Sequence, residues 1–211
     1  WKQPIVLAVG GNGAVQTHIA ELRERSVRVE MPDARRPDFI LAGADGVGYG
    51  RFELDAASQQ YLLMNVQGLA SGLHRAIVWQ HLWEALLEDR LAATDLYQAL
   101  LVAVQQEQDP LIAQQVLGLI RNIWWRYLDD EHRELRAGAL ETTLWQALAD
   151  ADSAGEKGAY FNALVDVTGT DQGLQLLADI WNMRRDIPGL PLQEQQYIHL
   201  AETLALKGVP D

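Results

Sequence analysis

The chain has 211 residues, of which 48% are hydrophobic and 22% charged, a composition ordinary for a globular protein with a substantial core. Its formal net charge is −12, and residues 56–211 carry nearly all of it, with 21 acidic against 10 basic side chains. Such a surface repels a phosphate backbone, so nucleic acid is excluded as an expected partner. Solubility explains the charge, and attraction for basic peptides is the alternative explanation.

The residues that are missing narrow the function classes further. The sequence has no cysteine, which excludes disulfides, thiolate catalysis and cysteine-based zinc sites. A chain without cysteine tolerates either redox environment, so the compartment stays open between the cytoplasm, the periplasm and the exterior. No apolar run reaches the ~18–20 residues of a membrane-spanning helix, and we therefore expect no membrane span.

The first part of the chain has the pattern of short strands. Apolar or alternating runs predict four of them: Pro4–Val9, Val27–Met31, Phe39–Leu41 and Tyr49–Leu54. The glycine-rich residues 10–13 briefly resemble a dinucleotide-binding turn, but the third glycine and the following helix are missing, which favours a hairpin. We expect residues 1–55 to form part of a small antiparallel β-sandwich.

From Asp55 onward the hydrophobic period becomes helical. A broad apolar stripe predicts a long helix over Leu73–Leu87, and capping signals at Thr94, Asp109 and Asp129 predict the starts of three more. These three are expected to end near Gln106, Tyr127 and Ala149. Shorter helices are predicted at Lys157–Val167, Asp171–Met183 and Pro191–Leu206.

Seven or eight helices joined by short loops predict successive antiparallel helix pairs over residues 56–211. No repeat of fixed period is present, which favours an irregular HEAT- or armadillo-like α-superhelix over consensus tetratricopeptide or ankyrin arrays. The fold class is therefore mainly α, preceded by the β-sandwich portion. The chain starts abruptly at Trp1 and ends just after an apolar helix, so we expect a fragment with further helices missing at its C-terminus.

The sequence contains neither of the two catalytic motifs considered next. A zinc peptidase needs two histidines four residues apart with a glutamate between them, and no histidine pair has this spacing. His74 and His81 lie seven apart with Glu84 following, too far apart along a helix for one ion, so ordinary histidines are favoured. No serine lies in a G-x-S-x-G context. We predict no catalytic residue, metal ligand or cofactor in this chain.

The most unusual helical segment is Trp124–Tyr127. Adjacent tryptophans point about 100° apart on a helix, so one can enter the core while Trp125 and Arg126 face a groove or a second domain. Tryptophan and arginine dominate interface hot spots, which makes Trp125, Arg126 and Arg51 candidates for peptide contact. Core packing for the tryptophans, and a structural salt bridge or cap for each arginine, are the favoured alternatives.

The passage Phe39–Phe52 reads Phe-Ile-Leu-Ala-Gly-Ala-Asp-Gly-Val-Gly-Tyr-Gly-Arg-Phe. It resembles the end of the third domain in M1-family zinc aminopeptidases, where members carry Leu-Asn followed by Gly-Tyr-Tyr-Arg-Val. Ala42-Gly43 stands where the family often has an Asn-containing pair, and Gly50 replaces the second aromatic residue. The helix around Leu82–Leu86 is also similar to the family's next segments, and the resemblance covers the chain in order.

The resemblance implies a function for a larger protein. M1 enzymes release N-terminal residues from peptides with one zinc ion, bound by HExxH and a downstream glutamate in a catalytic domain. This chain would be the non-catalytic C-terminal region, with the catalytic domain of the same polypeptide and the peptide substrates as partners. It would close over the active site, helping to bind and size-select peptides, and would be inactive alone. The alternative is a helical-repeat interaction scaffold unrelated to peptidases; an independent hydrolase has no motif behind it.

Overall fold

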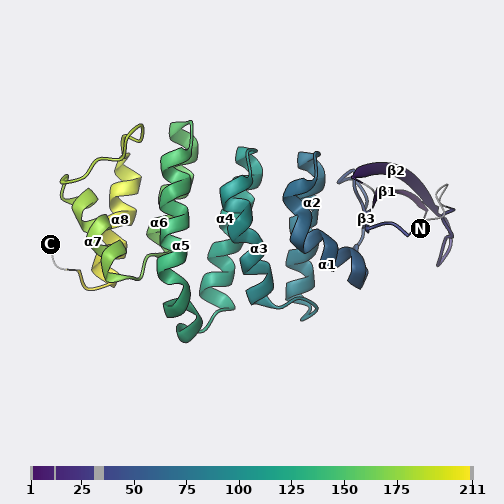
Figure 1. Cartoon of the computed structure of the whole chain (residues 1–211), viewed down its shortest axis with the longest axis horizontal. Coiled ribbons are helices and arrows are strands. Elements are labelled where there is room, and N and C mark those ends of the chain that lie inside the picture. The colour runs from purple at the N-terminus through teal and green to yellow at the C-terminus, as the bar shows by residue number, and fades with distance from the viewer. Residues whose placement is uncertain (1, 12, 31–35, 210–211) are drawn as a thin grey trace. The chain divides into compact units, whose positions relative to one another are not determined.

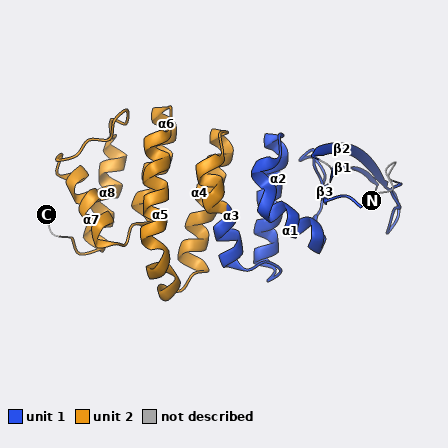
Figure 2. Cartoon of the chain, viewed as in Figure 1, with its two compact units in different colours: residues 1–99 blue, residues 100–211 orange. Residues whose placement is uncertain are grey.

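The computed structural model describes residues 2–11, 13–30 and 36–209. The chain divides into two compact units, residues 1–99 and residues 100–211 (Figure 2). The described residues form a three-stranded sheet, then eight α-helices and one short 3₁₀ helix (Figure 1). The expectation of a mainly helical chain with a small antiparallel sheet at its N-terminal end is confirmed. No helix in the described ranges combines the length and the apolar character that crossing a bilayer requires.

The sheet is built on a hairpin. Strand β1 (Gln3–Gly11) pairs antiparallel with β2 (Ala14–Leu22) from Gln3 opposite Leu22 to Gly11 opposite Ala14, and this confirms the hairpin prediction. Strand β3 (Phe39–Ala42) pairs with the other edge of β1, giving the order β2-β1-β3. Strand β2 was not predicted, because Val15 and Ile19 are its only large apolar residues before Leu22 and leave little apolar alternation to recognise.

Two predicted strands are wrong. Residues 27–30 have no regular structure, and Met31 lies outside the described residues. The segment Tyr49–Leu54 is irregular as well. Its hydrogen bonds go to a side chain instead of a neighbouring strand: Gln3 Nε2 donates to the Tyr49 carbonyl at 2.7 Å, and the Tyr49 amide donates to Gln3 Oε1 at 3.1 Å. A glutamine side chain thus satisfies backbone groups that a strand would pair in a ladder.

Helix α1 (Ala56–Asn65) follows the irregular segment and contacts β3. Asp55 caps it by accepting from the amides of Ala57 and Ser58, and the Ser58 hydroxyl accepts from the Ile40 amide at 2.9 Å. A 3₁₀ helix, η1 (Val66–Gly68), leads to α2 (Gly72–Leu87), where Trp79 and Leu82 are buried. The long helix predicted over Leu73–Leu87 is therefore confirmed.

The remaining helices also start close to their predicted capping signals. They are α3 (Ala93–Gln106), α4 (Pro110–Arg126), α5 (Asp130–Asp150), α6 (Ala154–Val167), α7 (Asp171–Trp181) and α8 (Glu194–Leu206). Asp109 and Asp129 cap α4 and α5 as expected. Helix α6 begins three residues earlier than predicted because Ser153 and Glu156 form a capping box.

The core of the C-terminal unit lies between its helices. Helices α5 and α6 pack against each other, α6 also contacts α4 and α8, and α7 contacts α8. The largest fully buried side chains here come from α3, α4, α5 and α6: Leu100, Ile120, Ile123, Trp124, Leu140 and Phe161. This core fixes the ends of α5 and α6, where the best candidate site of the unit lies.

Candidate functional site: an acidic pocket in the C-terminal unit

The glycine-rich passage that carries the family resemblance forms a cradle for Phe52. Gly43 has a φ of +67°, and a Cβ atom added there would lie 2.8 Å from the Phe52 ring. A Cβ atom at Gly48 would also lie 2.8 Å from that ring. Phe52 in turn stacks on His81 of α2, with ring centroids 6.1 Å apart. Glycine is therefore required sterically at both positions, and the passage serves to seat an aromatic ring against α2.

His81 and His74 both lie on α2. His81 is buried against Phe52, and burial lowers the pKa of both imidazoles from the ordinary value of 6.5. Within the described ranges, no three His, Cys, Asp or Glu side chains are grouped so that they could hold a metal ion.

Arg51 lies in a surface ion-pair network. Its guanidinium pairs with Glu53 and with Glu88, the latter at 2.5 Å, and Glu88 also pairs with Arg90 at 2.8 Å. These contacts agree with a structural salt bridge at Arg51. Contact between Arg51 and a peptide stays a prediction.

The two adjacent tryptophans of α4 have different surroundings. Trp124 is buried, whereas Trp125 is 45% exposed and Arg126 lies at the surface. The Trp125 indole donates to the Asp166 carbonyl at 3.1 Å, and Arg133 lies 5.4 Å from the centre of its ring. Lys207 also lies 5.4 Å from the centre of this ring, so neighbours of its own unit hold Trp125 in place. Peptide contact by Trp125 and Arg126 stays a prediction.

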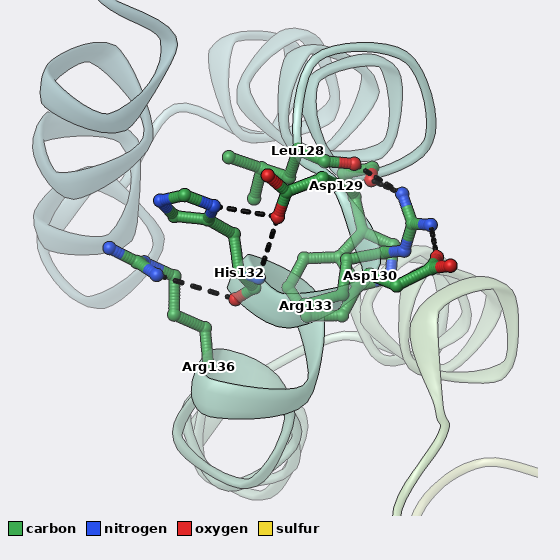
Figure 3. A network of polar contacts seen from close by, with 7 residues as sticks. Leu128, Asp129, Asp130, His132, Arg133 and Arg136 are labelled. Carbon is green, nitrogen blue, oxygen red and sulfur yellow. Dashed lines mark hydrogen bonds and ion pairs between the residues drawn. The ribbon is translucent and has the colours of Figure 1, made fainter.

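Arg133 joins the end of α4 to the start of α5 (Figure 3). Its guanidinium donates to the Trp124 carbonyl at 3.2 Å and to the Leu128 carbonyl, and it pairs with Asp130. A cation that binds the last carbonyls of a helix satisfies acceptors which the helix leaves open. The arginine therefore has a structural role at this junction.

The same junction accounts for the acidic run at the start of α5. Asp129 accepts from the His132 amide at 2.8 Å and lies 2.6 Å from His132 Nδ1 (Figure 3). The hydrogen bond from the His132 amide holds the pKa of Asp129 below its ordinary value, and the His132 side chain lowers it further. An ionised helix cap explains this carboxylate without any acid–base chemistry.

A cavity of about 710 Å³ lies where the end of α3, the end of α5 and the start of α6 meet. This volume falls in the range of small-ligand sites. Four carboxylate side chains and three amide side chains line it, together with Tyr160 and three small or aliphatic residues: Val104, Gln105, Glu107, Gln108, Gln146, Ala147, Asp150, Ala151, Asp152 and Glu156. None of the residues that line this acidic pocket is basic.

Local hydrogen bonds hold two of the four carboxylates in position. Glu107, which is only 9% exposed, accepts from the amides of Gln108 at 3.0 Å and Asp109 at 2.9 Å, and this fixes it in the loop after α3. Glu156 accepts from the Ser153 amide at 3.1 Å in the capping box of α6. Both carboxylates are therefore placed before any ligand arrives.

The other two carboxylates, Asp150 and Asp152, are exposed at the end of α5. Gln146 Nε2 donates to both carboxylate oxygens of Asp150 at 3.0 Å. An acidic residue at the C-terminal end of a helix lies near the negative end of the helix dipole, which is electrostatically unfavourable. Lys157 Nζ offsets part of this by donating to the carbonyls of Leu148 at 3.0 Å and Ala149 at 3.2 Å.

Tyr160 of α6 also lines the acidic pocket. Its side chain is 7% exposed. Burial, and then the charges of Glu156 and Glu107, raise the pKa of Tyr160 above 10.0. The hydroxyl is therefore protonated at neutral pH and has a proton to donate.

None of the pocket's residues was predicted as a site residue. Glu107 belongs to the loop after α3, while the other three carboxylates lie between the last residue of α5 and the first turn of α6. The sequence does show acidic residues near the predicted helix ends, with few basic residues beside them. It does not show which of these helix ends lie next to one another in the fold.

Comparisons with known protein families and with curated proteins find no match for this sequence.

Proposed function

We propose that this chain is the non-catalytic C-terminal region of an M1-type zinc aminopeptidase. In this proposal its helices form a HEAT-like array of antiparallel pairs that closes over the active site of the same polypeptide. The array helps to bind peptide substrates and to limit their length. Zinc, its ligands and the catalytic glutamate belong to the catalytic domain, and this chain contributes no residue to the chemical step.

One observation carries the proposal. The glycine-rich passage Phe39–Phe52 joins a small antiparallel sheet to a run of helices, which is the order of elements that the family resemblance implies. Its glycines are needed at Gly43 and Gly48 to admit the Phe52 ring. The motif thus has a steric reason to be kept in a chain that must connect these two kinds of structure.

The reading frame upstream of Trp1 provides the direct test. We expect it to encode HExxH followed by a glutamate on a second helix. A frame that lacks this motif would overturn the peptidase proposal. As a biochemical check, the isolated chain incubated with zinc should release no amino acid from aminoacyl reporter substrates, and zinc-dependent turnover by this chain would contradict a non-catalytic role.

A helical interaction scaffold with no peptidase relative is the second candidate. The partly exposed Trp125 favours it, because tryptophans are common at binding surfaces. The two candidates differ in their partner. A pulldown in which the chain retains a peptidase catalytic domain and no other stable partner would count against the scaffold.

A further inference from the structure

We infer that His81 is a proton-sensitive switch for the segment Gly43–Phe52, here called the cradle segment. The neutral imidazole keeps this segment closed on α2, and uptake of a proton at mildly acidic pH releases the segment while the helix itself stays folded. The inference goes beyond the proposed function and does not depend on it, because it concerns contacts within the N-terminal unit alone.

The cradle segment lies along one face of α2. A Cβ atom at Gly46 would lie 3.6 Å from a methyl group of Leu73 and 3.9 Å from one of Ile77, and the Phe52 ring stacks on His81. Leu73, Ile77 and His81 are spaced four residues apart, so they follow one another along the same side of the helix. At the Phe52 ring the segment therefore meets a titratable side chain.

The surroundings of His81 suit its neutral form. The side chain is 6% exposed, and its Nδ1 atom has no hydrogen-bond partner among the described residues. A protonated imidazole carries N–H donors on both ring nitrogens, so protonation leaves a buried donor at Nδ1 without an acceptor. The charged ring can gain an acceptor by turning towards water, and this movement removes the surface on which Phe52 stacks.

The charged groups around His81 do not compensate a proton there. On α2, Glu84 favours the charged imidazole, but burial outweighs it and lowers the pKa of His81. On the cradle segment, Asp45 is exposed and Arg51 pairs with two glutamates. The neighbouring elements β1, β3, η1 and α1 contain no charged residue.

The direction of the pH dependence follows from the two states of His81. In the closed segment burial holds its pKa below 6.5, whereas in the open segment the imidazole returns to an ordinary pKa. Between these two values the open form binds more protons. Lowering the pH through this window should therefore favour opening by about tenfold for each pH unit, and above pH 6.5 the closed form is fully favoured.

Amide hydrogen exchange, measured by NMR on the whole chain between pH 7.5 and 5, tests this switch. The amides of Ala44, Gly46 and Tyr49 donate hydrogen bonds at 3.0, 2.9 and 3.1 Å in the closed segment. Their protection factors should fall by about tenfold per pH unit below pH 6.5, while those of Val78 and Leu82 on α2 stay constant. A parallel fall at all five amides would mean general unfolding and would overturn the switch, as would protection that does not change with pH.

Two histidine variants locate the switch. His81→Phe keeps an aromatic ring against Phe52 but cannot take up a proton, so protection of the cradle segment should stay constant within about twofold over this pH range. The matched control is His74→Phe, which replaces the other histidine of α2, whose pKa burial also lowers, and should keep the tenfold dependence. An unchanged pH dependence in His81→Phe, or its loss in both variants, would overturn the inference.

The imidazole signals keep the inference testable if His81→Phe does not fold. In the wild-type chain, the NMR signals of the His81 ring should titrate below pH 6.5. Phe52→Leu removes the ring that covers the imidazole, so the pKa of His81 should rise towards 6.5 and the cradle segment should lose protection already at pH 7.5. A pKa of His81 that is the same in Phe52→Leu as in the wild type would contradict the switch.

Discussion

Glu141 is a buried carboxylate that holds the loop between α6 and α7. It is 8% exposed and accepts from the amides of Gly169 at 2.8 Å and Thr170 at 2.9 Å, with a further hydrogen bond from the Thr170 hydroxyl. Gly173 has to be glycine here, since a Cβ atom would lie 2.3 Å from Glu141 Oε2. One carboxylate therefore satisfies three donors in a loop that has no strand or helix to pair with.

Removing this carboxylate should destabilise the chain measurably. Glu141→Ala leaves the part-buried amides of Gly169 and Thr170 without their acceptor, so we expect the free energy of unfolding to fall by about 1–2 kcal/mol. Urea denaturation followed by circular dichroism measures this. Glu134→Ala on the exposed side of the same helix is the control, with an expected change within about 0.5 kcal/mol. Equal losses in the two variants would contradict the account of Glu141.

His81 makes stability depend on pH. It is 6% exposed, its Nδ1 has no hydrogen-bond partner among the described residues, and burial lowers its pKa below 6.5 despite the opposing charge of Glu84. Between the lowered folded pKa and the unfolded value, the unfolded chain binds more protons. The contribution of neutral His81 to the free energy of unfolding is therefore fully present above pH 6.5, and it is lost as the pH falls from 6.5 through the lowered pKa of the folded state.

Melting temperatures between pH 7.5 and 5 test the effect of His81. We expect the wild-type melting temperature to fall with pH, and His81→Phe to flatten the decline because phenylalanine keeps an aromatic ring against Phe52 but cannot be protonated. His74 shares the direction of the pKa shift, so part of the slope should remain. An identical slope in the variant and the wild type would show that burial of His81 has no such consequence.

Helix α4 shows how strongly one residue can define an element. Asp109 accepts from the amides of Leu111 at 2.9 Å and Ile112 at 3.4 Å, and Pro110 occupies the first helical position. Asp109→Ala should cost about 1 kcal/mol of unfolding free energy, whereas Asp109→Asn keeps an acceptor oxygen and should cost clearly less. Thermal or urea unfolding compares the two. If both cost the same, the side-chain cap is not what stabilises the helix start.

Such local signals explain which elements could be predicted. The starts of α4, α5 and α7 are determined by neighbouring caps, and the sequence therefore indicates them within a few residues. Strand β2 depends on pairing with β1 and buries little besides Ala20. In the segment Tyr49–Leu54, the backbone of Tyr49 is hydrogen-bonded to the side chain of Gln3, which lies far away in the sequence. Both therefore depend on tertiary contacts that periodicity does not report.

The acidic pocket depends on tertiary structure even more. Its carboxylates are separated by more than forty residues of chain between Glu107 and Asp150, and packing of α6 against α5 and α4 brings them together. The exposure of Trp125 was predictable, because adjacent tryptophans on one helix must face different directions. The place of Tyr160 in the pocket was not predictable, because it depends on the packing of α6 against its neighbours.

At the scale of the whole molecule, the net charge of −12 sets the response to salt. Raising NaCl from about 10 mM to about 150 mM shortens the screening length from about 30 Å to about 8 Å. This weakens repulsion among the acidic side chains, and it also weakens exposed ion pairs such as Arg121–Asp166, whose charged atoms lie 3.2 Å apart. Such pairs contribute only about 0–1 kcal/mol each.

With 29 acidic against 17 basic residues, relief of repulsion among the acidic side chains should dominate, and the melting temperature should rise with salt. Repeating the measurement with KCl distinguishes screening from binding of sodium, because screening depends on ionic strength alone. A melting temperature that falls with both salts would mean that the ion pairs outweigh the acidic excess.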